Sequence, residues 1–459
     1  MTARRLLRAL LVALAGAGAA ASAKPAGGAG ELFSSYRTVT VELRAPFDDL
    51  FANARDDKEY SVEGSLAYTA DTGERGAIRD VKVALRGHTS RGESECAFPK
   101  LKLSFAATDQ APLFAGRTSV KVGTHCDDKD GLTPKYGRLA NERSPWREAF
   151  VYRLLDALEV PALKARPARI TYVFTSGDGN AGEGRRLTRN ALLLEDDDDA
   201  KQRFGASGDI TEEKFTSADA AFAPADTARL VFAEALIGNF DWCLRMTRGD
   251  TYRCDARHPL WNILAFTRDG RATPVIYDFD VSGMVAGRHQ WFHEVYNEAF
   301  VPSKSAAAVE VLGQLQRTRS LFPRDLLNAT RASFLQRKND AYAALKDAPL
   351  DDEGRSTIKE YADSFFDAIA SDEAFYRPVV VTPESVAWLD AERSERACGA
   401  RSSIPVGTPV SEALESRGGM ARVRLLDVFW HWAPPDVCAA AHRDPVWVDQ
   451  AAISRQYPK

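Results

Sequence analysis

Hydrophobic and polar residues alternate along the first part of the chain, between about residues 38 and 105. Side chains of successive residues in a strand point to opposite faces, so this alternation predicts antiparallel strands with one buried face. Gly- and Asp-rich turns separate the segments. They are TVTVEL (38–43), YSVEGSLAY (60–68), VKVAL (81–85) and KLKLSF (100–105), followed later by RITYVF (169–174) and ALLLE (191–195) on either side of a Gly-rich hairpin.

Apolar residues at a spacing of three and four replace this alternation in other segments, and this spacing predicts helices. One helix opens at Ser144-Pro145-Trp146, with a cap and a first-turn proline in the expected places, and stops before Pro161. Another runs through LVFAEALI and ends at Gly238. Three more are expected at 305–318, 322–346 and 354–370. The chain is therefore predicted to be α+β, with its strands mainly in the first half.

The pattern changes again near residue 399, where short apolar runs and a Gly-Gly turn predict a small β domain at 399–459. Its segments GTPV, ARVRLL and VWVDQ resemble a bacterial SH3-like domain. Such a domain could bind a peptide or a wall polymer through Trp430, Trp432 and Trp447. The alternative is that these aromatic residues belong to the core of a small β-barrel.

The first 23 residues have arginines, then a Leu/Ala-rich run, then Ala21-Ser22-Ala23, which is the pattern of a secretory signal peptide. Residues 24–37 form a tether. No later stretch reaches the ~20 uninterrupted apolar residues of a membrane span. The net charge of -4 gives no indication of nucleic-acid binding. We therefore expect an exported protein, periplasmic or extracellular, without a transmembrane segment.

Six cysteines fit an oxidising compartment, where they could form three disulfides. Six cysteines allow 15 pairings. We expect each cysteine to pair with its neighbour along the chain, and no zinc-type spacing is present. The expected pairs are Cys96 with Cys126, Cys243 with Cys254, and Cys398 with Cys438.

Acidic and amide side chains follow directly after the buried segments between residues 230 and 283. Asp241 follows the helix that ends at Gly238, Asn262 precedes one apolar run, and Asp278 and Asp280 end the next. Mg²⁺ prefers oxygen ligands from one or two such groups and leaves other positions to water and phosphate. The order Asp, Asn, Asp is that of a protein kinase, although Asp241 and Asn262 are farther apart than in kinases. The alternative is that these residues cap turns and satisfy backbone groups.

Basic residues precede this region. Lys100 and Lys102 share one face of a predicted strand, so they either reach a phosphate or lie on a solvated face. The segment LRGHTSRG (85–92) could bind an anion through its backbone, with Arg86 or Arg91 supplying charge, or could be an ordinary hairpin turn.

Three further acidic or histidine features have two interpretations each. Glu148 could pair with a strand lysine or could be solvated. The acidic run 196–199 could serve a metal ion or a basic substrate but is more typical of a solvated loop. His289 and His293 could form a metal pair if helical, with packing or a substrate contact as the alternative.

Taken in order, these motifs resemble the spore-coat protein H (CotH) kinase-like family. The resemblance covers LRGHTSRG, FPKLKLSF, the helix WREAFVYRLLDALEVPA, ALLLED, GNFDW, WNILAF and YDFD followed by a Ser-Gly pair, from about Val81 to Gly283, with a looser helical tail. It implies an atypical protein-kinase-like fold at 38–394, with a β-rich lobe at about 38–200, a helical lobe at about 201–394 and ATP between them.

The resemblance also implies roles for individual residues. Asp241 would be the catalytic aspartate, and Asn262, Asp278 and Asp280 would hold Mg²⁺ or Mn²⁺. The nucleotide ATP would be bound by Arg86, Lys100 or Lys102, with Glu195 at the lobe junction. The implied function is a secreted Ser/Thr protein kinase acting on a protein of the cell envelope or of a spore or surface coat. The alternative is a non-catalytic surface binding protein that retains the kinase-like scaffold.

Overall fold

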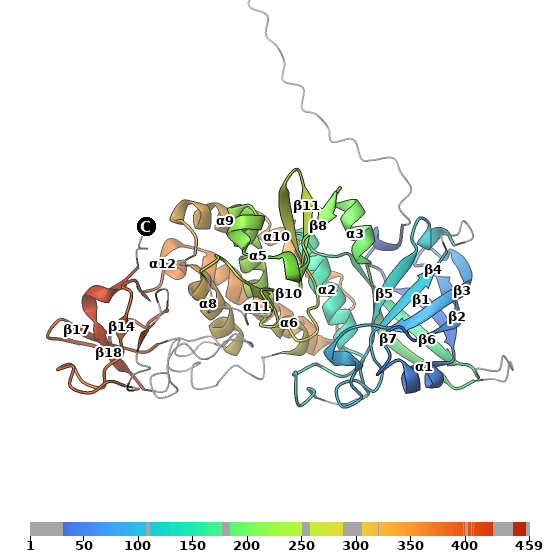
Figure 1. The fold of residues 1–459 in the computed structure, drawn as a ribbon, viewed down its shortest axis with the longest axis horizontal. Coiled ribbons are helices and arrows are strands. Elements are labelled where there is room, and N and C mark those ends of the chain that lie inside the picture. Colours follow the sequence, from blue (N-terminus) through green and yellow to red (C-terminus); the bar gives the residue numbers. More distant parts are fainter. Residues whose placement is uncertain are drawn as a thin grey trace, which may run out of the picture.

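The computed structural model describes residues 31–106, 111–129, 131–176, 184–249, 258–287, 305–319, 321–397, 399, 403–404, 406, 408–425 and 444–455. Figure 1 shows three parts along the long axis: a β-barrel at one end, a mainly helical part in the middle and a small β unit at the other end. The predicted α+β class is confirmed.

Seven strands close into a barrel in the order β1-β2-β3-β4-β5-β7-β6. All neighbouring strands are antiparallel except β1 and β6, which run parallel and close the barrel by pairing Val39 with Ala168. The sequence predicted strands in these places except at β5, and it predicted neither the closure nor the parallel pair. The strands are β1 (Val39–Ala45), β2 (Ser61–Thr69), β3 (Arg75–Leu85), β4 (Leu101–Phe105), β5 (Ser119–Gly123), β6 (Ala165–Phe174) and β7 (Arg186–Leu194).

The barrel encloses an apolar core because alternate side chains of each strand point inward. In β1, Val39, Val41 and Leu43 are buried while their neighbours are at least partly exposed. Burying each such side chain stabilises the fold by roughly 1.5–3 kcal/mol. One short helix, α1 (Phe47–Asn53), packs Phe47 against this core within 5.6 Å of the Tyr172 ring centre.

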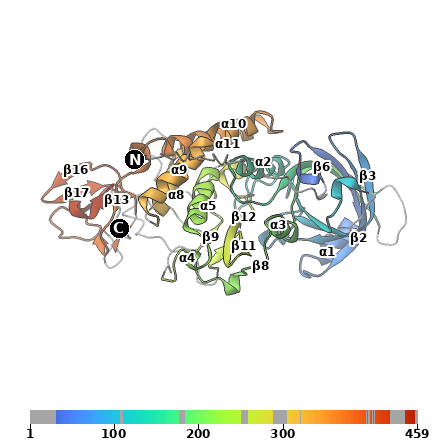
Figure 2. The ribbon, with the colours of Figure 1, turned by 90° about the horizontal axis from the view of Figure 1, so that it is seen from above.

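Helix α2 (Ser144–Ala157) joins the barrel to the helical part. It packs on β6 and β7 of the barrel and on α6 (Gly283–Ala286) and α10 (Lys338–Lys346) of the helical part. Figure 2 shows α2 next to β6, between the barrel and the other helices. Trp146 at its start donates from Nε1 to the carbonyl of Ala168 at 2.9 Å. The helix is therefore fixed to a barrel strand at its first turn.

The helical part surrounds α5 (Pro224–Ile237), whose side chains are buried from Leu230 to Ile237. An aromatic cluster of Phe232, Phe334 and Phe365 packs around it. The expected single helix at 322–346 is instead two helices, because the backbone turns at Arg337. The other helices here are α4 (Ala218–Ala221), α8 (Ala306–Arg319), α9 (Arg324–Gln336), α11 (Asp352–Ile369) and α12 (Asp372–Phe375).

Short strands lie between the barrel and the helices. A three-stranded sheet has the order β12-β11-β8, and a two-stranded sheet pairs β10 with β9. These sheets bring the segments that carry the acidic residues into one region of the structure. They are β8 (Gly208–Asp209), β9 (Cys243–Leu244), β10 (Leu260–Trp261), β11 (Ile263–Arg268) and β12 (Arg271–Ile276).

The C-terminal β unit begins earlier than the expected residue 399, because β13 pairs with β19 and Val380 belongs to its core. Trp447 is buried and pairs through its backbone with Trp388, so it packs inside the unit. Trp430 and Trp432 lie outside the described residues. The strands are β13 (Val379–Val380), β14 (Ser385–Val386), β15 (Ser403–Ile404), β16 (Glu415–Arg417), β17 (Met420–Val423), β18 (Val446–Asp449) and β19 (Ile453–Ser454).

Among the helices that the structure describes, none combines the length and the apolar character needed to cross a membrane.

Candidate functional site

The first candidate residue, Asp241, is placed by the end of α5. Gly238 ends this helix with φ of 63°, a left-handed conformation, and a Cβ there would lie 2.3 Å from Tyr361 Cε1. The position therefore favours glycine on both counts. The chain then turns, and Asn239 Oδ1 accepts a hydrogen bond from the Asp241 N–H at 3.0 Å. The backbone of Asp241 is therefore fixed independently of the contacts that its carboxylate makes.

Asn262 and Trp261 hold the carboxylate of Asp241. Asn262 Nδ2 donates to the Asp241 carbonyl at 2.6 Å and to Oδ2 at 3.2 Å, and Trp261 Nε1 donates to Oδ1 at 3.3 Å. Asn262 has φ of 56°, which asparagine tolerates better than most residues. The residue predicted as a metal ligand thus also positions the candidate catalytic aspartate.

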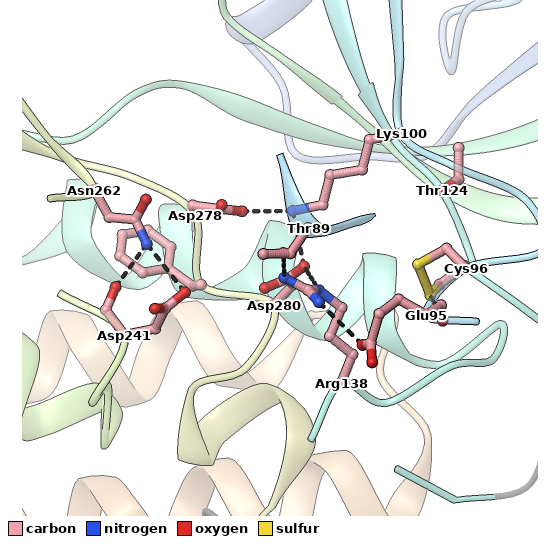
Figure 3. Close-up of polar contacts among 12 residues, drawn as sticks. Thr89, Glu95, Cys96, Lys100, Thr124, Arg138, Asp241, Asn262, Asp278 and Asp280 are labelled. Carbon is pink, nitrogen blue, oxygen red and sulfur yellow. Dashed lines mark hydrogen bonds and ion pairs between the residues drawn. A yellow bond between two sulfur atoms is a disulfide. The ribbon is translucent and has the colours of Figure 1, made fainter. Parts of the chain in front are cut away.

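Asp278 and Asp280 follow β12 and meet the lysine that precedes β4 (Figure 3). Lys100 Nζ lies 2.5 Å from Asp278 Oδ1 and 2.8 Å from Asp280 Oδ2. The lysine side chain is 8% exposed. Asp278 has φ of 66°, and its N–H donates to the Tyr152 hydroxyl of α2 at 3.0 Å. The structure therefore brings together residues that are far apart in the sequence, as a binding site requires.

Burial and the two carboxylates act in opposite directions on Lys100. Burial lowers the pKa of this ammonium group, but the charges of Asp278 and Asp280 outweigh it, so the pKa lies above its ordinary value. Asp280 has a lowered pKa because Arg138 and Lys100 outweigh its burial. Asp280 and Lys100 are therefore both charged at neutral pH.

Glu148 of α2 is 3% exposed, so its interpretation as a solvated residue was wrong. Burial, opposed by the charge of Lys100, raises the pKa of Glu148 to about 7. Its Oε1 is buried and makes no hydrogen bond. Glu148 is thus a third carboxylate, after Asp278 and Asp280, whose charge acts on Lys100. The direct pairing that the functional interpretation proposed stays a prediction.

Lys100, Asp241 and Asp278 line one cavity of about 590 Å³, together with Trp261 and Asn262. This volume lies within the range of small-molecule sites. One wall is apolar and includes Ile263, Phe266 and Tyr277. The Nε of Arg86 is buried and makes no hydrogen bond, so this cation is available to an anion. The cations that line the cavity are Arg86, Lys100, Lys121, Arg138 and Lys201, and the carboxylates include Asp197, Asp198, Asp209, Glu212, Asp241 and Asp278.

The segment 85–92 lines the cavity through Gly87, His88, Thr89 and Ser90. It belongs to a long hairpin connection rather than a tight turn, because β3 and β4 pair antiparallel and η2 (Thr89–Arg91) and a loop lie between them. Arg91 points away from the cavity and donates to the carbonyls of Ala54 and Leu85. Arg86, not Arg91, is therefore the cation that this segment brings to the site.

Other candidates lie outside the cavity. Lys102 pairs with Asp196 at 2.8 Å, and Glu195 pairs with Arg203 at 2.7 Å and accepts from the Lys164 N–H. Neither lines the cavity. Lys102 links β4 to the N-cap of α3 (Asp197–Arg203), and Glu195 links the end of β7 to the last turn of the same helix.

The acidic run is not a solvated loop, because Asp196 caps α3 by accepting from the Asp198 N–H. Two more of its members pair with basic residues, Asp197 with Lys121 and Asp199 with Arg117, both at 2.5 Å. The run thus fixes the first turn of a helix.

The carboxyl group of Asp241 has a raised pKa. Burial, followed by the charges of Asp278 and Asp280, raises the pKa of Asp241 to about 7. A carboxyl group with a pKa near the working pH can both accept and release a proton.

The donor set fits a hard divalent cation. Asp280 Oδ1 is buried without a hydrogen bond, and Asn262 uses only its Nδ2 on Asp241. Among the described residues, no three Asp, Glu, His or Cys side chains are placed to hold an ion together. An ion bound here by two carboxylates and an amide would keep positions for water and phosphate, as Mg²⁺ commonly does.

Sequence reasoning missed Glu234, which lies in the middle of the apolar helix α5 and is fully buried. Its Oε2 accepts from Asn239 Nδ2 at 2.9 Å, and Asn239 in turn holds the Asp241 N–H. Burial raises the pKa of Glu234 to about 8. A single acid within an apolar helical run was the signal that could have identified it.

We expect Glu234→Gln to be more stable than the wild type at pH 8 and close to it at pH 4. The unfolded chain loses this proton near pH 4.5, whereas the folded protein keeps it to about pH 8. Between these values the folded state binds more protons, so wild-type stability falls with rising pH by up to about 1.4 kcal/mol per unit. Urea unfolding of both proteins from pH 4 to 8 measures this. Parallel pH curves for the two proteins would contradict a raised pKa of Glu234.

The Cys96–Cys126 disulfide is confirmed. Cys243 is also disulfide-bonded, while Cys254, Cys398 and Cys438 lie outside the described residues, as do His289 and His293. The pairing expected for those cysteines stays a prediction.

No family model matches the chain, and no curated protein matches it. Among solved structures, it is similar to the Helicobacter pylori proinflammatory kinase CtkA, with 10% sequence identity and a TM-score of 0.28. The match covers 60% of this chain and 94% of that one. A similarity of this extent assigns neither a family nor an activity to the chain.

Proposed function

We propose that this protein is a kinase that transfers the γ-phosphoryl group of ATP to a Ser or Thr hydroxyl of another exported protein. The observation that supports it is the arrangement around one cavity. Lys100 contacts Asp278 and Asp280 on one side, and Asp241 is held by Asn262 on the other. These groups could neutralise phosphate charge, hold a divalent cation and orient a hydroxyl.

The residues of the chain would divide the work as follows. Asp241 would orient the acceptor hydroxyl and take its proton. Asp278, Asp280 and Asn262 would hold Mg²⁺ or Mn²⁺, which supplies charge stabilisation at the β- and γ-phosphates. Arg86 and Lys100 would bind phosphate oxygens, and the apolar wall would accept the base. Catalysis by these groups is positioning and electrostatic stabilisation.

Lys100 would change partners when nucleotide binds. In this structure its ammonium group lies between the two carboxylates that would hold the cation. Glu148 is the remaining buried carboxylate that acts on its charge. Glu148 would therefore stabilise Lys100 once the cation takes Asp278 and Asp280. This exchange is consistent with the unpaired Oε1 of Glu148.

The proposal also covers the localisation of the protein, its acceptor and the role of its C-terminal β unit. Residues 1–23 would direct export to the periplasm or beyond, and the acceptor would be a protein of the cell envelope or of a spore or surface coat. The C-terminal β unit would hold a peptide or a wall polymer near the kinase part. The kinase-like division into two lobes would correspond to the barrel and the helical part on either side of the cavity.

The test is label transfer from γ-labelled ATP by the oxidised protein lacking residues 1–23, with Mg²⁺ or Mn²⁺. We expect label to be incorporated into the protein itself or into a generic acceptor. This activity should co-elute with the protein and should be lost without metal. ATP at 100 times its dissociation constant should also stabilise the fold by about 2.7 kcal/mol in a melt. Neither label nor metal-dependent stabilisation would overturn the kinase and leave a binding protein on this scaffold.

A further inference from the structure

Arg138 connects the acidic pair of the site to the loop before β4. Its Nε donates to Asp280 Oδ2 at 2.8 Å, Nη1 to Glu95 Oε2 at 3.3 Å and Nη2 to Thr89 Oγ1 at 2.6 Å (Figure 3). Every nitrogen of the guanidinium group is thus engaged. The group is almost fully buried, with 6% of its side chain exposed. A planar group with three partners fixes the direction of Asp280 more tightly than a single ion pair would.

The backbone at Arg138 is also fixed. Its N–H donates to Thr133 Oγ1 at 3.0 Å, and its carbonyl accepts from the Thr133 N–H at 2.8 Å. The loop that carries Arg138 follows directly after Cys126, which is bonded to Cys96. Glu95, the neighbour of Cys96, has its carbonyl oxygen 3.2 Å from Cys126 Sγ. One disulfide therefore ties together the two segments that supply Arg138 and Glu95.

We propose that Arg138 is a positioning residue for Asp280 in the cation site, and that the Cys96–Cys126 disulfide maintains this contact through Glu95. The inference rests on the proposed function, because it needs a cation at Asp278 and Asp280. The disulfide would make the affinity of the site for metal depend on oxidation. A protein kept reduced would have a weakened site.

The direction in which one substitution changes the affinity for metal distinguishes a positioning role of Arg138 from a purely electrostatic one. Arg138 is a cation close to the acidic pair, so by Coulomb's law its removal should strengthen binding of another cation. Loss of a residue that orients a metal ligand instead weakens metal binding, commonly by 10- to 100-fold. The two roles predict opposite changes in the dissociation constant of Mn²⁺ for Arg138→Met.

The matched control is Arg166→Met. Arg166 is another buried arginine, with 1% of its side chain exposed, that pairs with Asp71 and donates to the carbonyls of Arg37 and Leu32. It does not line the cavity. Both substitutions remove a buried guanidinium group, but only Arg138 contacts a candidate metal ligand.

The experiment measures free Mn²⁺ by electron paramagnetic resonance with the oxidised full chain, without nucleotide. We expect Arg138→Met to weaken Mn²⁺ binding by about 10- to 100-fold and Arg166→Met to leave it unchanged. Arg138→Lys keeps the charge but not the three contacts, so it should also weaken Mn²⁺ binding. This variant replaces Arg138→Met in the test if Arg138→Met does not fold. Equal or tighter binding by the Arg138 variants overturns the inference while the proposed function stands. No binding by the wild type overturns the inference, whereas the proposed function is then decided by the label-transfer test.

The disulfide is tested with Cys96→Ser/Cys126→Ser, because a reductant would also attack the disulfide of Cys243. This variant should weaken Mn²⁺ binding in the wild-type background and have little further effect when Arg138→Met is already present. Such non-additivity is the signature of residues that act through one contact. Additive effects, or no effect in the wild-type background, would overturn the part of the inference that concerns the disulfide.

Discussion

Asp278→Ala is expected to abolish label transfer from ATP. The substitution removes one of the two carboxylates that would hold the cation, and with it several kcal/mol of charge stabilisation in the transition state. At 1.36 kcal/mol for each factor of ten, the rate should fall by about 10³-fold or more. The fold should survive, because Lys100 keeps Asp280 at 2.8 Å. Initial rates at saturating ATP and metal measure the effect.

The control for this variant is Asp340→Ala, because Asp340 is an exposed aspartate on α10 that does not line the cavity. It makes the same change of side chain and charge, and its rate should equal that of the wild type. Substantial label transfer by Asp278→Ala would show that the carboxylates after β12 do not hold the metal, and would remove the main support for the proposed mechanism.

Asp241→Asn is expected to lower the rate by about 10²- to 10⁴-fold, which is the usual contribution of a general base. Asparagine keeps an oxygen for the Trp261 hydrogen bond but cannot take a proton from the acceptor hydroxyl. Binding of ATP and Mn²⁺ should persist, because Asp278, Asp280 and Lys100 are unchanged. A rate within a few-fold of wild type would assign Asp241 a structural role.

The pH profile provides a second readout for Asp241. Its pKa is raised to about 7, so the carboxylate that accepts the proton forms only as the pH rises through 7. The wild-type kcat/KM should therefore increase with pH up to a plateau above about pH 7. The rise should be absent from the residual activity of Asp241→Asn. A wild-type profile that is flat between pH 5.5 and 8.5 would contradict this role.

The local elements could be predicted from the sequence because each leaves a periodic pattern. Val39, Val41 and Leu43 alternate with polar residues, and all three lie in β1. The spacing after Pro145 and the glycine at 238 likewise mark where α2 starts and α5 ends. Closure of the barrel could not be predicted in this way. The pairing of Val39 with Ala168 joins segments far apart in the sequence, and such contacts leave no periodic trace.

The candidate site was most clearly predictable where its residues end an apolar segment. Asp241 and Asp278 stand out because an acid follows a buried run. Arg138 does not, since it lies in a loop without periodicity and its partners Glu95 and Asp280 come from distant segments. Lys100 and Lys102 looked equivalent on one strand face. In the structure, however, Lys102 meets the carboxylate that caps α3, whereas Lys100 meets Asp278 and Asp280. Tertiary contacts decided between them.

The parallel pair of β1 and β6 has a consequence for how the protein is made. The strand that must complete the barrel is the first to leave the ribosome, and its partner ends only at Phe174. At 5–20 residues per second, synthesis of the intervening chain takes roughly 7–26 s. Throughout that time one edge of β1 has no native partner and is open to pairing with other chains. Folding of the barrel is therefore expected to be slow and to depend on what protects this nascent edge.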